Sequence, residues 1–267
     1  MVSITVMAGM VFAAVVAIGL PIAIYLVLRR RLELKFIPTL VGAGVFIVMV
    51  LVLEHTLHTF VLQPAADGSI ALIKTNPAFY ATYAVLAAGI FEETGRFVAF
   101  KLLRKRYQGV RTAISYGIGH GGIEAILLVG LNMVAYLALA VMINTGSGPA
   151  LPPVVTDLLA QFDLSSLLLG GVERVFAIVI QLTLSVLVWV AATQQGKWWL
   201  YPVAIVVHAL IDVPAVLLQI GMLDIVSVEL IVAALAAVLA VVGWRIVTAN
   251  LAAEKSTLAI MAAGRDR

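Results

Sequence analysis

The stretch VSITVMAGMVFAAVVAIGLPIAIYLVL (Val2–Leu28) decides the fold class, because its 27 consecutive residues include no charged side chain. About 20 apolar residues in a helix cross a bilayer core roughly 30 Å thick. The run is too long for the core of a signal peptide, and neither a basic residue nor a small-residue cleavage site marks it as one. We therefore expect Val2–Leu28 to be a retained membrane-spanning helix.

The composition extends this expectation to the whole chain. Of its 267 residues 63% are hydrophobic and 12% charged, and the mean hydropathy is +1.12. A soluble domain is roughly 45–50% apolar and about 25% charged. We predict an all-α, polytopic membrane bundle of about seven (seven or eight) transmembrane helices. No internal repeat or linker divides the chain, so we expect a single membrane-embedded domain over residues 1–267.

Charges and turn residues separate the expected spans. The spans lie near residues 2–28, 36–62, 77–103, 110–143, 170–193, 198–220 and 223–247. The fourth is long enough to be kinked, tilted or extended beyond the bilayer, and its glycines (Gly117, Gly119, Gly121 and Gly122) would allow a kink or close helix packing. Residues 144–170 could form a loop or a re-entrant segment.

Basic residues predict the orientation. In the seven-span arrangement, 14 of the 17 Lys and Arg residues fall on one side, which the positive-inside rule makes cytoplasmic. They are Arg29, Arg30, Arg31, Lys35, Lys101, Arg104, Lys105, Arg106, Arg111, Lys197, Arg245, Lys255, Arg265 and Arg267. We expect an outside N-terminus, a cytoplasmic C-terminus and a multi-pass protein of a bacterial or archaeal inner membrane. The basic loops would contact membrane lipid, and no element indicates binding of nucleic acid.

Ionisable residues inside three spans are the main functional signal. An ionisable group near the bilayer centre costs about 2.5–3.5 kcal/mol, so such groups usually face the bundle interior and mark function. Glu93, His120 and His208 each lie about ten residues, or roughly 15 Å of helix, from the cytoplasmic end of their span. Three helices are thus expected to bring an acid and two imidazoles to one layer of the membrane.

Spacing places further polar groups beside this layer. His120 and Glu124 are four residues apart, as are His208 and Asp212, so each pair shares a helix face. Together His120, His208, Glu124 and Asp212 offer the nitrogen and oxygen ligands that zinc takes at catalytic sites. The chain has no cysteine, which excludes thiolate ligands and nucleophiles. Zinc is therefore the candidate cofactor, although the residues do not require one.

Arg96 follows Glu92 by four residues and Glu93 by three, so it could pair with either carboxylate. By contrast, counting residues along the second span places Glu54, His55 and His58 near the outer interface, away from the layer. Glu173 and Arg174 are expected to form a local or interhelical ion pair.

The order of these residues resembles a known group. Glu-Glu-Thr-Gly-Arg (Glu92–Arg96), Tyr-Gly-Ile-Gly-His-Gly-Gly-Ile-Glu (Tyr116–Glu124) and His-Ala-Leu-Ile-Asp (His208–Asp212) resemble the YhfC family of predicted bacterial intramembrane peptidases. That family is in turn similar to the CAAX-processing and bacteriocin-processing proteases and to PrsW-type proteases.

The resemblance implies roles for matching positions. Glu92 and Glu93 match the paired glutamates, of which one activates water. Tyr116 and His120 match an aromatic-x-x-x-His motif, while His208 and Asp212 match the third motif. Arg96 stands one residue earlier than in the CAAX pattern. Glu124 has a counterpart only in the PrsW type, so glutamate-only and metal-assisted water activation both stay open.

We therefore expect an intramembrane protease that cleaves a peptide or membrane-protein substrate in the cytoplasmic half of the membrane. Glu92, Glu93, His120 and His208 would be catalytic, supported by Arg96, Tyr116, Glu124 and Asp212. The alternatives are a proton- or ion-coupled transporter, a non-catalytic binding module, and a hydrolase of lipid or prenyl-linked substrates. Buried acids and imidazoles also form proton relays, but no repeated halves or paired broken helices suggest a transporter.

Overall fold

The computed structural model describes residues 1–147 and 151–265, and these ranges contain helices but no strand, which confirms the all-α class. The helices are α1 (Ile4–Leu32), α2 (Phe36–Phe46), η1 (Ile47–Glu54), α3 (His55–Leu62), α4 (Leu72–Thr75), α5 (Pro77–Leu103), α6 (Val110–Glu124), η2 (Ala125–Gly130), α7 (Leu131–Thr145), α8 (Pro153–Ala160), α9 (Leu164–Thr193), α10 (Leu200–Gln219) and α11 (Ile225–Arg265). The elements η1 and η2 are π-helical.

Six helical segments of the described chain are long and apolar enough to cross a membrane. They are Ile4–Leu32, Phe36–Leu62, Val110–Thr145, Leu164–Thr193, Leu200–Gln219 and Ile225–Ser256. The remaining expected span, α5, has 27 residues, but Glu92, Glu93 and Arg96 lower its hydropathy. The membrane bundle is confirmed, and the expected count of about seven is close. The direction in which the helices cross the bilayer stays a prediction.

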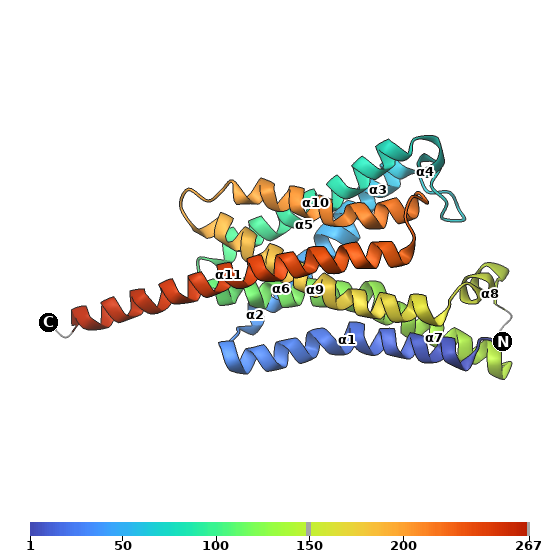
Figure 1. Cartoon of the computed structure of the whole chain (residues 1–267), viewed down its shortest axis with the longest axis horizontal. Helices are drawn as coiled ribbons and strands as arrows, with labels where there is room; N and C mark the ends of the chain where they lie inside the picture. Colours follow the sequence, from blue (N-terminus) through green and yellow to red (C-terminus); the bar gives the residue numbers. More distant parts are fainter. Residues whose placement is uncertain (148–150, 266–267) are drawn as a thin grey trace.

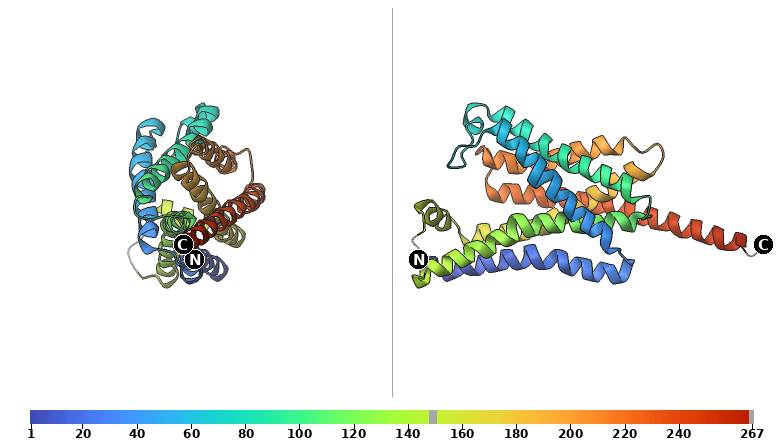
Figure 2. Two further views of the ribbon diagram at one scale, coloured as in Figure 1. Left: turned by 90° about the vertical axis from the view of Figure 1, so that its left-hand side faces the viewer. Right: turned by 180° about the vertical axis from the view of Figure 1, so that it is seen from behind.

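Helix α9 lies at the centre of the bundle and packs against α1, α5, α6, α10 and α11. Figure 1 shows the long helices aligned along one direction, with the N-terminus at one end and the end of α11 projecting beyond the bundle at the other. The second span, made of α2, η1 and α3, instead runs obliquely across its neighbours (Figure 2).

The fifth span begins earlier than the expected residue 170. Asp163 caps α9, because its side chain accepts a hydrogen bond from the Ser166 backbone N–H at 3.0 Å. Hydrogen bonds from Ser165 and Ser166 also lower the pKa of Asp163 to about 2, which keeps this cap ionised. Leu164–Leu169 therefore form the first turns of α9. The short helix α8 precedes them. Within the segment 144–170, residues 148–150 lie outside the described residues.

Helix α11 is also longer than the expected seventh span. It continues from Ile225 to Arg265, whereas the expected span ends near residue 247. Its extension reaches the start of α6, where Glu254 Oε1 accepts a hydrogen bond from the Val110 backbone N–H at 2.9 Å. This carboxylate satisfies one of the free N–H groups that every helix start leaves.

Glycines bring α2 and α6 into direct backbone contact. A Cβ atom added at Gly119 would lie 1.8 Å from the Thr39 carbonyl oxygen, and one at Gly42 would lie 2.2 Å from the Tyr116 carbonyl oxygen. The glycine-rich part of the fourth span therefore serves close packing, one of the two expected roles. This packing holds α6, which carries His120, firmly against α2.

We predict that Gly119→Ala destabilises the protein, because the added methyl group overlaps backbone that has no room to move; such overpacking costs about 1–3 kcal/mol. Thermal unfolding of detergent-purified protein would measure the change. Gly44→Ala is the matched control in α2, since a Cβ there meets nothing within 4 Å. Equal melting temperatures for the two variants would contradict the proposed backbone contact.

Candidate active site

Three helices bring four of the predicted residues together. Glu92 and Glu93 lie on α5, His120 near the end of α6, and His208 on α10. His120 Nε2 lies 2.9 Å from Glu92 Oε2, and His208 Nδ1 lies 2.6 Å from Glu93 Oε1. All four side chains are buried. The matched depths along the spans thus correspond to a real cluster of acids and imidazoles.

Glu92 lies between the two imidazoles. Its second carboxylate oxygen, Oε1, is 3.7 Å from His208 Nε2. The side chain of Glu92 is 9% exposed, whereas that of Glu93 is fully enclosed. Glu92 is therefore the carboxylate with both imidazoles and some open space beside it.

Arg96 pairs with both glutamates instead of one. Its Nη1 is 3.2 Å from Glu93 Oε1, and its Nη2 is 3.6 Å from Glu92 Oε2. The guanidinium is completely buried. Because one buried cation faces two buried carboxylates, removal of Arg96 would leave both carboxylates without their shared cation.

Gln181 of α9 joins this cluster, although the sequence analysis did not predict it. Its Oε1 accepts a hydrogen bond from Arg96 Nη2 at 2.5 Å, while its Nε2 donates to Glu92 Oε2 at 3.1 Å and to Glu124 Oε2 at 2.7 Å. Arginine can only donate, so the amide oxygen must face Arg96 and the amide nitrogen must face the carboxylates. The sequence signal that could have indicated Gln181 is a single polar amide within an otherwise apolar span.

Glu124 occupies the far side of this amide. Besides the Gln181 contact, its Oε1 lies 3.4 Å from Arg174 Nη1, and Arg174 also pairs with Glu173. The expected ion pair of Glu173 and Arg174 is present and extends to a neighbouring helix. Glu124 thus reaches Glu92 through Gln181 and not through the imidazole on its own helix.

Tyr116 and Asp212 each flank one imidazole. The Tyr116 hydroxyl is 3.5 Å from His120 Nδ1, at the limit of a hydrogen bond, and the two rings stack with centroids 5.7 Å apart. Asp212 Oδ2 lies 3.6 Å from His208 Nε2. The two residues therefore sit on opposite sides of Glu92, one against each histidine.

The donor atoms near His208 have the chemistry of a zinc site. Glu93 Oε1 lies beside His208 Nδ1, as a second carboxylate does for many metal-binding histidines, so a neutral ring with its hydrogen on Nδ1 would present the Nε2 lone pair to Glu92 and Asp212. Its distance of 3.6 Å to Asp212 Oδ2 is close to the roughly 3.3 Å between two ligands of tetrahedral zinc with bonds of about 2.0 Å. Nevertheless, no group of three His, Cys, Asp or Glu residues in the described chain is already arranged to hold a metal ion.

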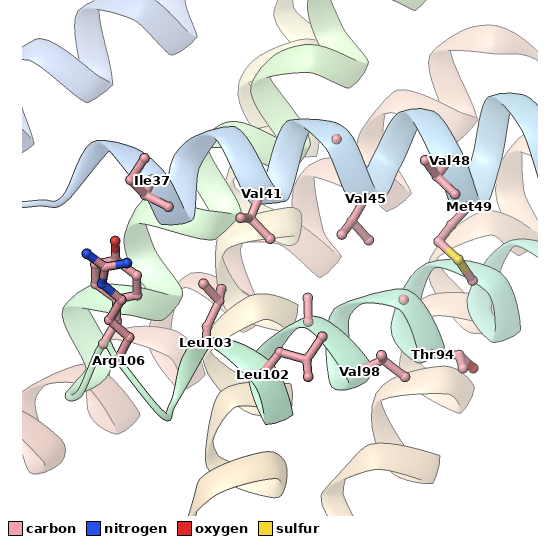
Figure 3. A pocket seen from close by; sticks show the side chains of 14 residues that line it. Ile37, Val41, Val45, Val48, Met49, Thr94, Val98, Leu102, Leu103 and Arg106 are labelled. Carbon is pink, nitrogen blue, oxygen red and sulfur yellow. The ribbon is translucent and has the colours of Figure 1, made fainter.

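A groove of about 690 Å³, lined mostly by apolar side chains, lies on the neighbouring face of α5. Figure 3 shows apolar side chains of α2, η1 and α5 along it, with Arg106 at one end and Met49 and Thr94 at the other. Thr94 and Gly95 line the groove and stand between Glu93 and Arg96 in the chain. The groove therefore runs beside the charged turn of α5, although the four clustered residues do not line it.

Comparisons with known proteins give a consistent result. A family model described as "YhfC intramembrane metalloprotease" matches residues 15–233. The chain is also 35% identical over 233 residues to the membrane protein YhfC of Bacillus subtilis (strain 168), a match that covers 83% of this chain and 89% of the relative. No solved structure matches the chain significantly. The matched region contains every residue of the cluster.

We predict that Gln181→Leu, which keeps the side-chain size but removes the amide, lowers stability by about 1–3 kcal/mol because it leaves buried polar partners unsatisfied. Thermal or denaturant unfolding in detergent would measure this. Gln194→Leu is the control, because Gln194 bonds to Asn250 at an exposed position. A loss no larger than that of the control would show that the amide does not hold the cluster together.

Proposed function

The chain belongs to the YhfC intramembrane metalloprotease family, and we propose that it is a protease that hydrolyses a peptide bond within the membrane. It is a multi-pass bacterial-type membrane protein, as its six apolar segments and its Bacillus relative indicate. The observation that carries the proposal is Glu92 between His120 and His208, buried in the middle of the bundle. The further likeness to CAAX-processing and PrsW-type proteases stays a prediction.

Of the two paired glutamates, we assign the role of general base to Glu92. Its contact with both imidazoles and its greater exposure support this choice over Glu93. Glu92 would take a proton from water while the water oxygen attacks the substrate carbonyl carbon. It would return that proton to the amide nitrogen as the carbon–nitrogen bond breaks.

The imidazoles and Glu93 have complementary roles in this proposal. His120 and His208 orient the water and stabilise the oxyanion that forms on the carbonyl oxygen. Glu93 accepts the Nδ1 hydrogen of His208 and is itself paired with Arg96, so it fixes the ring orientation. Tyr116 supports His120 in the same way from the other side.

The family description also implies a metal. We propose His120, His208 and Asp212 as the side chains that would hold it, because Glu124 is engaged by Gln181 and Arg174. A bound zinc would polarise the substrate carbonyl and lower the pKa of water. Glu92 would have the same task with or without zinc, so both the glutamic and the metal-assisted type remain within this proposal.

The groove of Figure 3 supports an apolar peptide segment as substrate. It lies along α2 and α5. Its end at Thr94 and Gly95, opposite Arg106, adjoins the turn that carries Glu93 and Arg96. A hydrophobic segment could approach the site from the bilayer along this surface.

We predict that Glu92→Gln, His120→Ala and His208→Ala each lower cleavage by roughly 10²–10⁴-fold, the usual contribution of acid–base groups. Reconstituted protein would be assayed against a library of fluorogenic peptides with apolar cores. His55→Ala, at an exposed position of α3, should retain wild-type activity. Full activity in all three site variants, each eluting as folded protein, would refute the assignment.

We also predict roughly one equivalent of zinc in the purified wild type and none in the double variant His120→Ala/His208→Ala, because a catalytic zinc needs about three protein ligands. Elemental analysis of detergent-purified protein would measure it. Cleavage by a preparation without zinc or any other transition metal would instead establish water activation by Glu92 alone.

A further inference from the structure

Glu54 lies closer to the site than residue counting suggested. It is the last residue of η1 and only 5% exposed, and the contacts of its neighbour His58 with Glu54 and with Tyr83 place it beside α5, the helix that carries Glu92. The oblique course of α2, η1 and α3 (Figure 2) accounts for the difference, because residue number along a tilted helix is a poor measure of depth. The π-helical turns of η1 end at this residue, and π-helical turns occur frequently at functional sites.

Glu54 begins a chain of polar contacts that leads away from the site. Its Oε1 lies 3.2 Å from His58 Nε2, and His58 Nδ1 lies 2.9 Å from the Tyr83 hydroxyl on α5. His58 is four residues from the end of α3, near the loop that carries α4. The contacts therefore connect the interior with the end of the bundle opposite the basic loops.

The exposed parts of these groups indicate water and not lipid. The side chains of His58 and Asp212 are 30% and 33% exposed. Ionisable groups inside a membrane protein face the bundle interior or a water-filled space, since contact with hydrocarbon is costly. In addition, Glu54 Oε2 is buried with no hydrogen-bond partner in the described chain. Buried polar atoms of this kind are commonly satisfied by water.

The opposite end of the site is closed by aromatic side chains. Phe100, Tyr116 and Trp189 lie between the charged cluster and the basic loops along α5, α6 and α9, and all three are buried. The Phe100 ring centroid is 4.6 Å from that of Tyr116 and 5.3 Å from that of Trp189. Such packing separates the cluster from the polar pockets at the basic-loop end.

We propose that water reaches the site from the α3–α4 end of the bundle, along a route lined by His58, Tyr83, Glu54 and Asp212. The route deepens the proposed hydrolase function and rests on it, because each cleaved peptide bond consumes one water molecule at a buried site. Glu54, in contact with His58 and with one carboxylate oxygen unpaired in the described chain, supplies a buried acceptor for the entering water. In this arrangement substrate arrives from the bilayer and water from the aqueous phase, by different paths.

The chain has no cysteine, so a single introduced cysteine is the sole thiol that a reagent can label. Glu54→Cys and His58→Cys test the inner and outer parts of the route. The neighbouring Leu53→Cys and Leu57→Cys are matched controls at nearly the same depth, since these leucines are 45% and 36% exposed on the apolar surface. A cationic, membrane-impermeant methanethiosulfonate would be applied from each side of sealed vesicles containing the full-length protein.

We expect Glu54→Cys and His58→Cys to be labelled at least about tenfold faster than their controls, and from the α3–α4 side only, because the reactive thiolate forms in water and not in hydrocarbon. Labelling of Glu54→Cys no faster than Leu53→Cys, or labelling only from the side of the basic loops, would overturn the route. Tyr83→Cys, with Leu86→Cys as its control on α5, provides the same test if Glu54→Cys does not fold. Labelling requires no proteolysis, so absent labelling with intact cleavage would refute the route alone, and labelling without cleavage would refute the protease proposal alone.

Discussion

The burial of Arg96 is the constraint on which the interior of this protein depends. An isolated buried ion costs several kcal/mol, and a guanidinium cannot lose its proton to avoid that cost. Glu92, Glu93 and Gln181 surround it with two carboxylates and one amide oxygen. These partners come from α5 and α9, so the position of one charge fixes the central pair of helices relative to each other.

The same arrangement determines what is available for chemistry. Glu93 is held by Arg96 and His208, and it serves mainly to orient its neighbours. Glu92 shares the cation but also faces both imidazoles. In the proposed mechanism, two adjacent residues of identical type therefore have different roles because their environments differ. This division follows from the geometry, since the sequence presents the two glutamates as equivalent.

Much of the architecture could be predicted from hydrophobic runs alone, because a bilayer requires long apolar helices with few charges. The helix boundaries were less predictable. Asp163 begins α9 through a local capping contact, and α11 continues to Arg265, beyond its apolar part, where hydropathy no longer indicates its length. The convergence of Glu93, His120 and His208 could also be predicted, since their spans run nearly parallel and equal residue counts correspond to equal depths.

Two residues near the site illustrate why other parts of the structure could not be predicted from the sequence. Gln181 is uncharged, so its presence in an apolar span is a weak signal, and its importance depends on the three partners that surround it. Glu54 is 5% exposed, whereas depth counted along its span, which crosses the others obliquely, places it near the outer interface. The estimate of depth requires a tilt angle that no sequence pattern supplies.

The glycine contact between α2 and α6 has a mechanical consequence. Where two backbones touch, neither sliding nor rotation is possible without collision, so these helices move as one rigid body that carries His120. In contrast, α2 and η1 meet α5 along the groove through side chains, such as those of Val45 and Met49 against Gly95. If the proposed substrate enters along this groove, a displacement of α5 away from the rigid pair would also move the carboxylates of α5 away from His120. Entry of the substrate and assembly of the proposed catalytic residues would then be coupled through the position of α5.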